Sequence, residues 1–298
     1  MQSGEEQEQF LVSRGYSRES ASVPVEMLLR WGRGELERVG IPQVEARWLL
    51  EWALGEPLGV RTHAGIRAAE KYRSAISQRR SRVPFQHITG EMTFRYLTLK
   101  AGPGVFVTRP ETETLVDLAL ATLEPGSAVV ADLCAGSGAI GLALATERSD
   151  TQVTMVEISP AAGRYLETNT RRVGQFAAGS RVRICMEDAT GALAGSEETL
   201  DLVVSNPPYV GIVDAPTQPE ALADPEIALF GGGEDGLVTP RGIVTRAYEL
   251  LRKHGTLLME HGEDQGAALV GHAVNVGFYS AETVDDLTGR PRFLRAVK

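Results

Sequence analysis

The residues of this chain best suited to chemistry lie in one short segment, Asn206-Pro207-Pro208-Tyr209, which follows the apolar run Leu202 to Val204. The apolar run predicts a short buried strand. Neither proline can donate a backbone hydrogen bond and each fixes its own φ angle, so the segment is stiff. It therefore presents an amide side chain, carbonyl acceptors and an aromatic ring at the end of a strand.

A planar –NH2 group would suit such a segment. Its two hydrogens can be donated to the Asn206 side-chain oxygen and the Pro207 carbonyl, while the Tyr209 ring stacks on its face. The lone pair of this nitrogen is delocalised, which makes the nitrogen a poor nucleophile. Fixing both hydrogens helps to orient the lone pair toward an electrophile, which is catalysis by positioning. The alternative is a proline-rich turn in which Asn206 satisfies local backbone groups.

Other polar and glycine residues also follow predicted strands. A glycine-rich turn, residues 134–141, comes after the strand at 128–133, Glu157 after the strand at 152–156, Asp188 soon after the strand at 181–185, and Glu260 after the strand at 256–259. Strands that alternate with helices imply a parallel sheet with helices on both faces. Ligands of such sheets bind outside the carboxyl ends of the strands, so we expect these residues to meet there.

These residues are of the types that bind adenosine. The glycines let a ligand approach the backbone closely, Glu157 stands about twenty residues after the turn and can accept two ribose hydroxyls, and Asp188 can receive an adenine amino group. Gly136-x-Gly138-x-x-Gly141 matches the dinucleotide fingerprint, so NAD is an alternative ligand. Asn206 to Tyr209 favours S-adenosylmethionine, because the segment suits methyl transfer to a planar nitrogen and has no part in hydride transfer.

Composition narrows the class of protein. The chain has 298 residues with a net charge of −9, which argues against a protein whose main task is to grip nucleic acid. No apolar run reaches the roughly 18 residues of a membrane helix, and the acidic N-terminus lacks the apolar stretch of a signal peptide. We therefore expect a cytoplasmic protein without membrane contact. Cys134 and Cys185 predict two buried free thiols, and no metal-ligand spacing is present, so no metal is expected.

The order of patterns along the chain predicts its domains. Residues 1–22 are polar and are expected to be disordered. Residues 23–84 carry three helical patterns and are expected to form a small helical substrate-recognition domain, in which the basic stretch 61–82 is either a solvated helix face or a contact surface for an acidic partner. Residues 85–104 suggest a β-hairpin linker, and residues 105–298 carry the alternating strands and helices.

As a set, several motifs resemble the HemK/PrmC family of N5-glutamine methyltransferases, over nearly the whole chain after residue 22. The stretches that carry the resemblance are 30–36, 86–91, 104–107, Arg109-Pro110-Glu111-Thr112-Glu113, the glycine turn, 156–160, 205–209, 224–230 with Gly236, and 289–293. The chain departs from the usual family pattern at Thr108 and Ala135, and the stretch between Tyr209 and Asp224 is somewhat short.

The resemblance implies an α/β fold: a seven-stranded Rossmann-like class I methyltransferase domain with a small helical N-terminal domain. It implies S-adenosyl-L-methionine as the cofactor, a class-1 peptide chain release factor as the partner, and methylation of the glutamine of that partner's Gly-Gly-Gln motif at N5. Asn206, Pro207, Pro208 and Tyr209 become the catalytic and substrate-binding residues, joined by Arg109 and Glu111 for the substrate. The residues implied to bind the cofactor are Asp132, Cys134, Ala135, Gly136, Ser137, Gly138, Glu157, Ile158, Asp188, Ala189 and Asn206.

Other functions remain open at this point. A paralogue could methylate another amide or guanidino nitrogen in a peptide or a small molecule. An N6-adenine methyltransferase of nucleic acid uses a similar loop on exocyclic amines, although the net acidity argues against it and no stable nucleic-acid binding is expected. A nicotinamide oxidoreductase and a catalytically inert binding protein are the alternatives from other classes.

Overall fold

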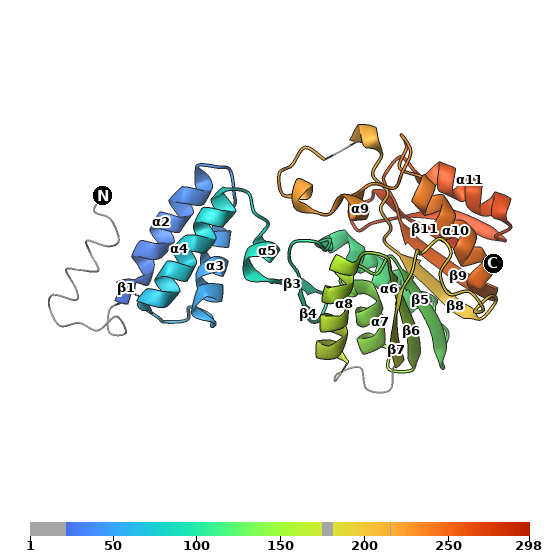
Figure 1. The fold of residues 1–298 in the computed structure, drawn as a ribbon, viewed down its shortest axis with the longest axis horizontal. Helices are drawn as coiled ribbons and strands as arrows, with labels where there is room; N and C mark the ends of the chain where they lie inside the picture. Colours follow the sequence, from blue (N-terminus) through green and yellow to red (C-terminus); the bar gives the residue numbers. More distant parts are fainter. Residues whose placement is uncertain (1–21, 175–180, 215) are drawn as a thin grey trace. The chain divides into compact units, whose positions relative to one another are not determined.

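The computed structural model describes residues 22–174, 181–214 and 216–298. The chain forms two compact units, with the boundary between Thr89 and Gly90 (Figure 1). This boundary falls inside the range 85–104, which the sequence suggested as a hairpin linker. The expected disorder of residues 1–22 lies outside the described residues, except at Ser22, which belongs to a strand.

The N-terminal unit is built from helices around a small apolar core. Its elements are β1 (Ser22–Pro24), α2 (Val25–Glu37), α3 (Val44–Leu54), β2 (His63–Gly65), α4 (Ile66–Arg80) and α5 (Phe85–Thr89), with β1 and β2 paired antiparallel. The three helices read from the sequence are α2, α3 and α4. Tyr72 of α4 is fully buried and packs against Gly32 of α2, where an added Cβ would lie 1.9 Å from the tyrosine oxygen. Glycine at this point lets the two helices approach.

The C-terminal unit contains a seven-stranded sheet in the order β10-β11-β9-β8-β5-β6-β7, which confirms the predicted fold class. The strands are β5 (Ala128–Leu133), β6 (Thr151–Glu157), β7 (Arg181–Met186), β8 (Leu200–Ser205), β9 (Leu251–Glu260), β10 (Ser280–Asp285) and β11 (Pro291–Val297). Strands β5 to β9 are mutually parallel, whereas β11 pairs antiparallel with both β9 and β10.

Both faces of the sheet are covered by helices (Figure 1). Alternate side chains of a strand point to opposite faces, so Val130 and Val204 join one apolar cluster while Ala131 and Val203 join another. The first cluster includes side chains of α6 (Glu113–Thr122), α7 (Ala139–Glu147) and α8 (Pro160–Val173), and the second includes side chains of α10 (Val238–Leu250) and α11 (Gly266–Val276). Strands that are apolar on both faces are therefore buried in the middle of three layers.

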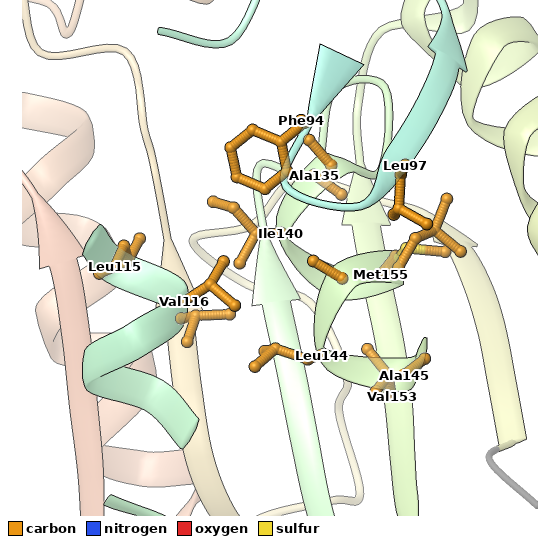
Figure 2. Packing of buried hydrophobic residues seen from close by; sticks show 14 of the residues in the cluster. Phe94, Leu97, Leu115, Val116, Ala135, Ile140, Leu144, Ala145, Val153 and Met155 are labelled. Carbon is orange, nitrogen blue, oxygen red and sulfur yellow. The ribbon is translucent and has the colours of Figure 1, made fainter. Parts of the chain in front are cut away.

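A β-hairpin closes the edge of the first cluster. Its strands β3 (Glu91–Phe94) and β4 (Leu97–Lys100) pair antiparallel, and Phe94 and Leu97 pack among the buried side chains of α7 and the sheet (Figure 2). At the turn between them, the Arg95 guanidinium forms ion pairs with Glu147 at 2.5 Å and with Asp117 at 2.8 Å. The hairpin is therefore part of the core of the C-terminal unit.

One buried amide, that of Asn169 in α8, joins the hairpin to the glycine-rich turn after β5. Its Oδ1 accepts a hydrogen bond from the Lys100 backbone N–H at 2.7 Å, and its Nδ2 donates to the Lys100 carbonyl at 3.1 Å and the Ser137 carbonyl at 3.0 Å. The Asn169 side chain is fully buried, so no water can replace these partners without rearrangement. This amide fixes one edge of the turn.

Replacement of this amide should destabilise the protein. We expect Asn169→Ala to lower the free energy of unfolding by about 2–4 kcal/mol, because it leaves part-buried backbone groups of Lys100 and the buried carbonyl of Ser137 without these partners. Urea denaturation of the full chain measures the change. Asn275→Ala, at an exposed position of α11, is the matched control and should change stability by less than about 0.5 kcal/mol. Equal effects of the two substitutions would contradict the role of Asn169.

Candidate active site

The candidate site lies where the strand order of the sheet reverses. Strand β5 has β6 on one side and β8 on the other, and a ligand crevice is expected outside the carboxyl ends at such a point. A cavity of about 410 Å³ opens there, lined by residues that follow β5, β6, β7 and β8. This volume lies in the range of small-molecule sites.

Most of the residues singled out from the sequence line this one cavity. They are Cys134, Ala135, Gly136, Ser137, Glu157, Ile158, Asp188, Ala189, Asn206, Pro207, Pro208 and Tyr209. Asp132, Gly138, Arg109 and Glu111 are not among its lining residues. The additional lining residues come mainly from the segments 104–108 and 225–230 and from Val238 and Thr239 at the start of α10.

Glu157 is held rigidly at the end of β6. Its Oε2 accepts a hydrogen bond from the Gly136 N–H at 2.8 Å, its Oε1 accepts one from the Ser159 N–H at 2.7 Å, and the residue is 8 % exposed. Ser159 also caps α8 by accepting a hydrogen bond from the Ala162 N–H. Each carboxylate oxygen has more than one lone pair, so Glu157 can still accept hydrogen bonds from a ligand in the cavity.

The acceptors in the cavity match the donors of an adenosyl group. Glu157 offers a fixed carboxylate for a pair of hydroxyls, and Asp188, whose Oδ1 accepts from the Thr190 N–H and hydroxyl, offers a second carboxylate further along. Gly136 has a φ of +57°, and its lack of a side chain exposes backbone to the cavity. Apolar side chains such as Ile158 also line the cavity. Hydroxyls, an amino group and a flat ring therefore each find a suitable partner.

Asp132 stabilises the end of the glycine-rich turn by a hydrogen bond to its backbone. Its Oδ2 accepts a hydrogen bond from the Gly141 N–H at 2.8 Å, while its Oδ1 has no partner among the described residues. Burial, and to a smaller degree the charge of Glu157, raises the pKa of Asp132 from 3.8 to about 7. A Cβ on Gly141 would lie 3.0 Å from this carboxylate, so glycine lets the helix start close to the strand. Asp132 thus acts on the cavity through the turn.

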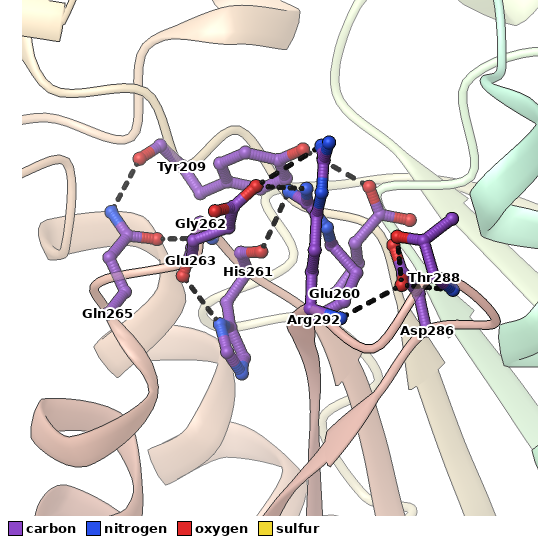
Figure 3. Close-up of polar contacts among 10 residues, drawn as sticks. Tyr209, Glu260, His261, Gly262, Glu263, Gln265, Asp286, Thr288 and Arg292 are labelled. Carbon is purple, nitrogen blue, oxygen red and sulfur yellow. Dashed lines mark hydrogen bonds and ion pairs between the residues drawn. The ribbon is translucent and has the colours of Figure 1, made fainter.

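We call the segment Asn206 to Tyr209 the clamp. Hydrogen bonds hold its last residue, Tyr209, at the side-chain hydroxyl and at the backbone carbonyl. The Tyr209 hydroxyl donates to Glu260 Oε1 at 3.1 Å, and the Tyr209 carbonyl accepts from Gln265 Nε2 at 2.7 Å (Figure 3). Gly236, with a φ of +69°, packs against the same carbonyl, where an added Cβ would lie 2.2 Å from the oxygen. In the described part of the chain, no hydrogen bond is donated to Asn206 Oδ1 or to the Pro207 carbonyl.

Two residues behind the clamp, Glu260 and Thr112, were not predicted from the sequence to be catalytic or binding groups. Glu260, at the end of β9, is 1 % exposed, and its Oε2 accepts a hydrogen bond from the fully buried Thr112 hydroxyl at 2.7 Å. That hydroxyl in turn accepts from Asn206 Nδ2 at 3.4 Å. Glu260 was recognisable as an acid at the carboxyl end of a strand, but the sequence could not show that it faces Thr112.

Burial is the main cause of the pKa shifts of Glu260 and Tyr209. Desolvation raises the pKa of Glu260 to about 7, against the lowering effect of its two hydrogen bonds and of the Arg292 charge. Desolvation and then the charge of Glu260 raise the pKa of Tyr209 above its usual range. The Tyr209 hydroxyl therefore keeps its proton at neutral pH and can donate a hydrogen bond.

The arm at 109–113 is tied to the segment that begins at Asp224. The Arg109 guanidinium forms an ion pair with the buried Asp224 carboxylate at 2.7 Å, and the Val107 N–H donates to the other oxygen at 3.2 Å. Pro225 to Phe230 then contribute to the cavity wall. The structure thus brings together the motifs at 109–113 and 224–230, which are far apart in the sequence. Arg109 does not line the cavity itself and acts on its wall through the ion pair with Asp224.

In the N-terminal unit, part of the basic stretch 61–82 is neutralised by acids of the same unit. Arg79 is buried and pairs with Glu45 at 2.6 Å, and Arg80 pairs with Glu35 at 2.8 Å. A contact surface for an acidic partner stays a prediction for the remaining cations.

The described residues contain neither a candidate membrane-spanning helix nor a candidate metal site. None of the helices there is both long and apolar enough to cross a membrane. The described ranges also contain no group of three or more His, Cys, Asp or Glu side chains arranged to hold a metal ion. Cys134 and Cys185 are free thiols, as the sequence predicted. The prediction that both are buried was wrong, because each side chain is only half-buried.

Comparisons with known proteins agree on one type of protein. A family model described as methyltransferase small domain matches residues 96–270, and one described as PrmC N-terminal domain matches residues 27–90. A Bifidobacterium longum protein named release factor glutamine methyltransferase is 42% identical over 82% of this chain and 84% of its own length. Proteins of the same name from Mycolicibacterium smegmatis and Moorella thermoacetica are 39% and 36% identical, over 87% and 92% of this chain and 92% and 96% of their own lengths.

The raised pKa of Asp132 makes stability depend on pH. Unfolding exposes the carboxyl, whose pKa then returns toward 3.8 from about 7, so the unfolded chain binds fewer protons than the folded one between these values. The contribution of Asp132 is thus fully present below its unfolded pKa and is lost as pH rises through about 7. We expect the unfolding free energy of Asp132→Asn, relative to the unsubstituted protein, to rise between pH 5 and pH 8 in urea titrations. Parallel pH curves for the two proteins would contradict this origin of the shift.

Proposed function

The chain belongs to the release factor glutamine methyltransferase family, and on this premise we propose that it transfers a methyl group from S-adenosylmethionine to the side-chain amide nitrogen, N5, of a glutamine. The proposed substrate is the glutamine of the Gly-Gly-Gln motif of a class-1 peptide chain release factor. The observation that carries the proposal is that acceptors suited to an adenosyl group and the rigid clamp Asn206 to Tyr209 line the same cavity.

The residues at the ends of β5, β6 and β7 would hold the cofactor. We assign Glu157 to the ribose hydroxyls, Asp188 to the adenine amino group and the backbone of residues 134–138 to close contact with the ligand, supported from below by Asp132. Ile158 and Ala189 would flank the flat ring, and Asn206 would contact the cofactor from the clamp. When bound, S-adenosylmethionine supplies a methyl group activated by the positive charge on its sulfur.

The clamp would hold the amide that is methylated. The two hydrogens of a glutamine –NH2 would be donated to Asn206 Oδ1 and to the Pro207 carbonyl, two acceptors that carry no hydrogen bond in the described part of the chain. The Tyr209 ring would lie against the face of the amide. Because both hydrogens are fixed, the nitrogen presents its lone pair in one direction, and orientation of this kind is a large part of the rate gain in such reactions.

Proton transfer needs no special base in this scheme. The amide nitrogen becomes acidic once it is alkylated, so its proton can leave to water after the methyl group has moved. Pro208 acts by keeping the backbone between Pro207 and Tyr209 stiff. Arg109 and Glu111 would contribute to substrate binding from the arm.

The proposed substrate also sets the partner and the location. A class-1 release factor is a protein of translation, so we place the enzyme in the cytoplasm and expect no stable complex with nucleic acid. Its net charge of −9 supports this, because phosphate-dominated binding requires basic protein surface.

The direct test is methyl transfer from labelled S-adenosylmethionine to a class-1 release factor and to a version with Gly-Gly-Gln changed to Gly-Gly-Ala. We expect label on the first protein and none on the second, which identifies substrate, reaction and site together. Equal labelling of both would contradict the assigned site. No label on either, with tight cofactor binding, would retain the chemistry and direct the search to other amide or guanidino nitrogens.

Asn206→Ala should abolish turnover while the protein still binds its cofactor. Loss of one acceptor frees the substrate amide to rotate, and we expect kcat to fall by a factor of about 100 or more. The Kd for S-adenosylmethionine, measured by calorimetry, should change by less than about fivefold, since one hydrogen bond contributes about 1 kcal/mol. Asn275→Ala is again the control and should retain normal turnover. A normal kcat for Asn206→Ala would show that the clamp does not position the amide.

A further inference from the structure

The chain of hydrogen bonds behind the clamp has a direction, and this direction decides which end of the Asn206 amide faces the cavity. Asn206 Nδ2 donates to the Thr112 hydroxyl oxygen at 3.4 Å, and the Thr112 hydroxyl donates to Glu260 Oε2 at 2.7 Å. An ionised carboxylate only accepts hydrogen bonds. Thr112 must therefore use its single hydrogen toward Glu260, and only its lone pairs remain for Asn206.

This polarity leaves one orientation of the amide. A hydroxyl that accepts from Asn206 can be served only by the –NH2 end of the side chain, so Nδ2 is turned toward Thr112. Asn206 lines the cavity and Thr112 does not. The oxygen end of the amide is thus the end available to a ligand, which is the acceptor that the proposed substrate amide needs.

The same carboxylate also fixes the aromatic part of the clamp. Glu260 Oε1 accepts from the Tyr209 hydroxyl at 3.1 Å (Figure 3). The other oxygen, Oε2, accepts from Thr112 and acts on Asn206 through it. Glu260 itself is 1 % exposed and Thr112 is fully buried. Water cannot compete at this point, and a hydrogen bond in such an environment is stronger than in solvent.

We propose that Glu260 is a positioning residue for methyl transfer: its carboxylate sets the orientation of the Asn206 amide through Thr112 and the orientation of the Tyr209 ring directly. This inference rests on the proposed function of the clamp. It assigns to Glu260 no contact with substrate or cofactor, and it assigns to Thr112 the task of transmitting the polarity of the carboxylate.

Glu260→Gln is the discriminating variant, because it keeps shape and burial but introduces a donor. Thr112 and Tyr209 donate to different oxygens of Glu260. In glutamine one of these two positions is taken by the –NH2 group, which opposes the donor that faces it. We expect kcat for methyl transfer to fall at least about tenfold, with KM for the protein substrate and Kd for S-adenosylmethionine changed less than about twofold.

Thr112 provides the second variant and its rescue. Thr112→Val keeps the branched shape and removes the hydroxyl, so we expect a loss of kcat similar to that of Glu260→Gln, whereas Thr112→Ser keeps the hydroxyl and should retain most of kcat. Both substitutions break the same chain of hydrogen bonds. The double variant should therefore lose no more kcat than the more impaired of the two single variants, which is the non-additivity of residues that act as a unit. Full additivity of the two effects would overturn the proposal.

Glu147→Gln serves as the matched control for the change of charge. Glu147 is a largely buried carboxylate in the same unit, with 15% side-chain exposure, and it pairs with Arg95 away from the cavity. We expect this substitution to lower stability and to leave kcat unchanged. A loss of kcat in Glu147→Gln equal to that in Glu260→Gln would show that the effect of Glu260 is only structural.

Protonation of Glu260 should have the same effect as the glutamine substitution. The acid form carries its own O–H donor, which then competes with the hydrogens of Thr112 and Tyr209. The charged and titratable groups that act on Glu260 are Glu111 from η1 (Pro110–Thr112), Arg292 from β11 and Tyr209 from the clamp. Burial lowers the pKa of the neighbouring His261. We expect kcat to fall as pH decreases through about 7, and this dependence to be absent from the residual kcat of Glu260→Gln.

A measurement without substrate separates this inference from the proposed function. The side-chain NH2 resonances of Asn206 can be assigned in a ¹⁵N–¹H spectrum of the full chain as those missing from Asn206→Ala. We expect them to shift in Glu260→Gln and in Thr112→Val and to stay in place in Glu147→Gln. Resonances unmoved in Glu260→Gln would overturn the inference, whichever nitrogen the enzyme methylates. Shifted resonances with no methylation of a release factor would retain the inference and reject the proposed substrate.

Discussion

The stiffness of the clamp is the constraint on which the rest of the site depends. Two consecutive prolines remove two backbone donors and fix two φ angles, so the segment cannot adapt to a ligand and must be placed correctly by what surrounds it. Glu260 and Gln265 hold Tyr209 at its hydroxyl and its carbonyl. Gly236 leaves room for the same carbonyl. A rigid acceptor pair is useful only because these contacts fix where it points.

The supporting groups are polar and buried, which carries a penalty that the fold offsets locally. Asp132 and Glu260 each lie at the carboxyl end of a central strand with almost no exposure, and each pKa is raised to about 7 by burial. Burial of a charged group is unfavourable unless hydrogen bonds compensate. Backbone and hydroxyl donors provide part of that compensation, although Asp132 Oδ1 has no partner among the described residues. The acids fix the glycine-rich turn and the clamp. Precise placement at the site is thus obtained at the expense of stability.

The site also depends on elements far from it in sequence. Asn169 joins α8, the hairpin and the glycine-rich turn by three hydrogen bonds, while the ion pair of Arg109 and Asp224 joins the arm to the cavity wall. Each of these contacts links segments that the parallel topology alone would leave independent. The cavity is therefore a property of the whole C-terminal unit, and the separate strand ends would not form it.

The sequence by itself determined the type of fold, the family, and the part of the cavity lining that follows the strand ends, because each of these follows from local patterns. It did not show that residues of the segment 225–230 and Val238 also line the cavity. Apolar runs alternating with helical periods predict the parallel sheet, and chain order then puts Glu157, Asp188 and Asn206 at its carboxyl edge. The antiparallel strands β10 and β11 were not located from their own pattern, since their sequences are half polar and their pairing is non-local. Only the tertiary structure decided the partners: that Thr112 lies between Asn206 and Glu260, and that Arg109 meets Asp224. These contacts join residues more than ninety positions apart, and no local periodicity encodes the direction of a hydrogen bond across such a distance.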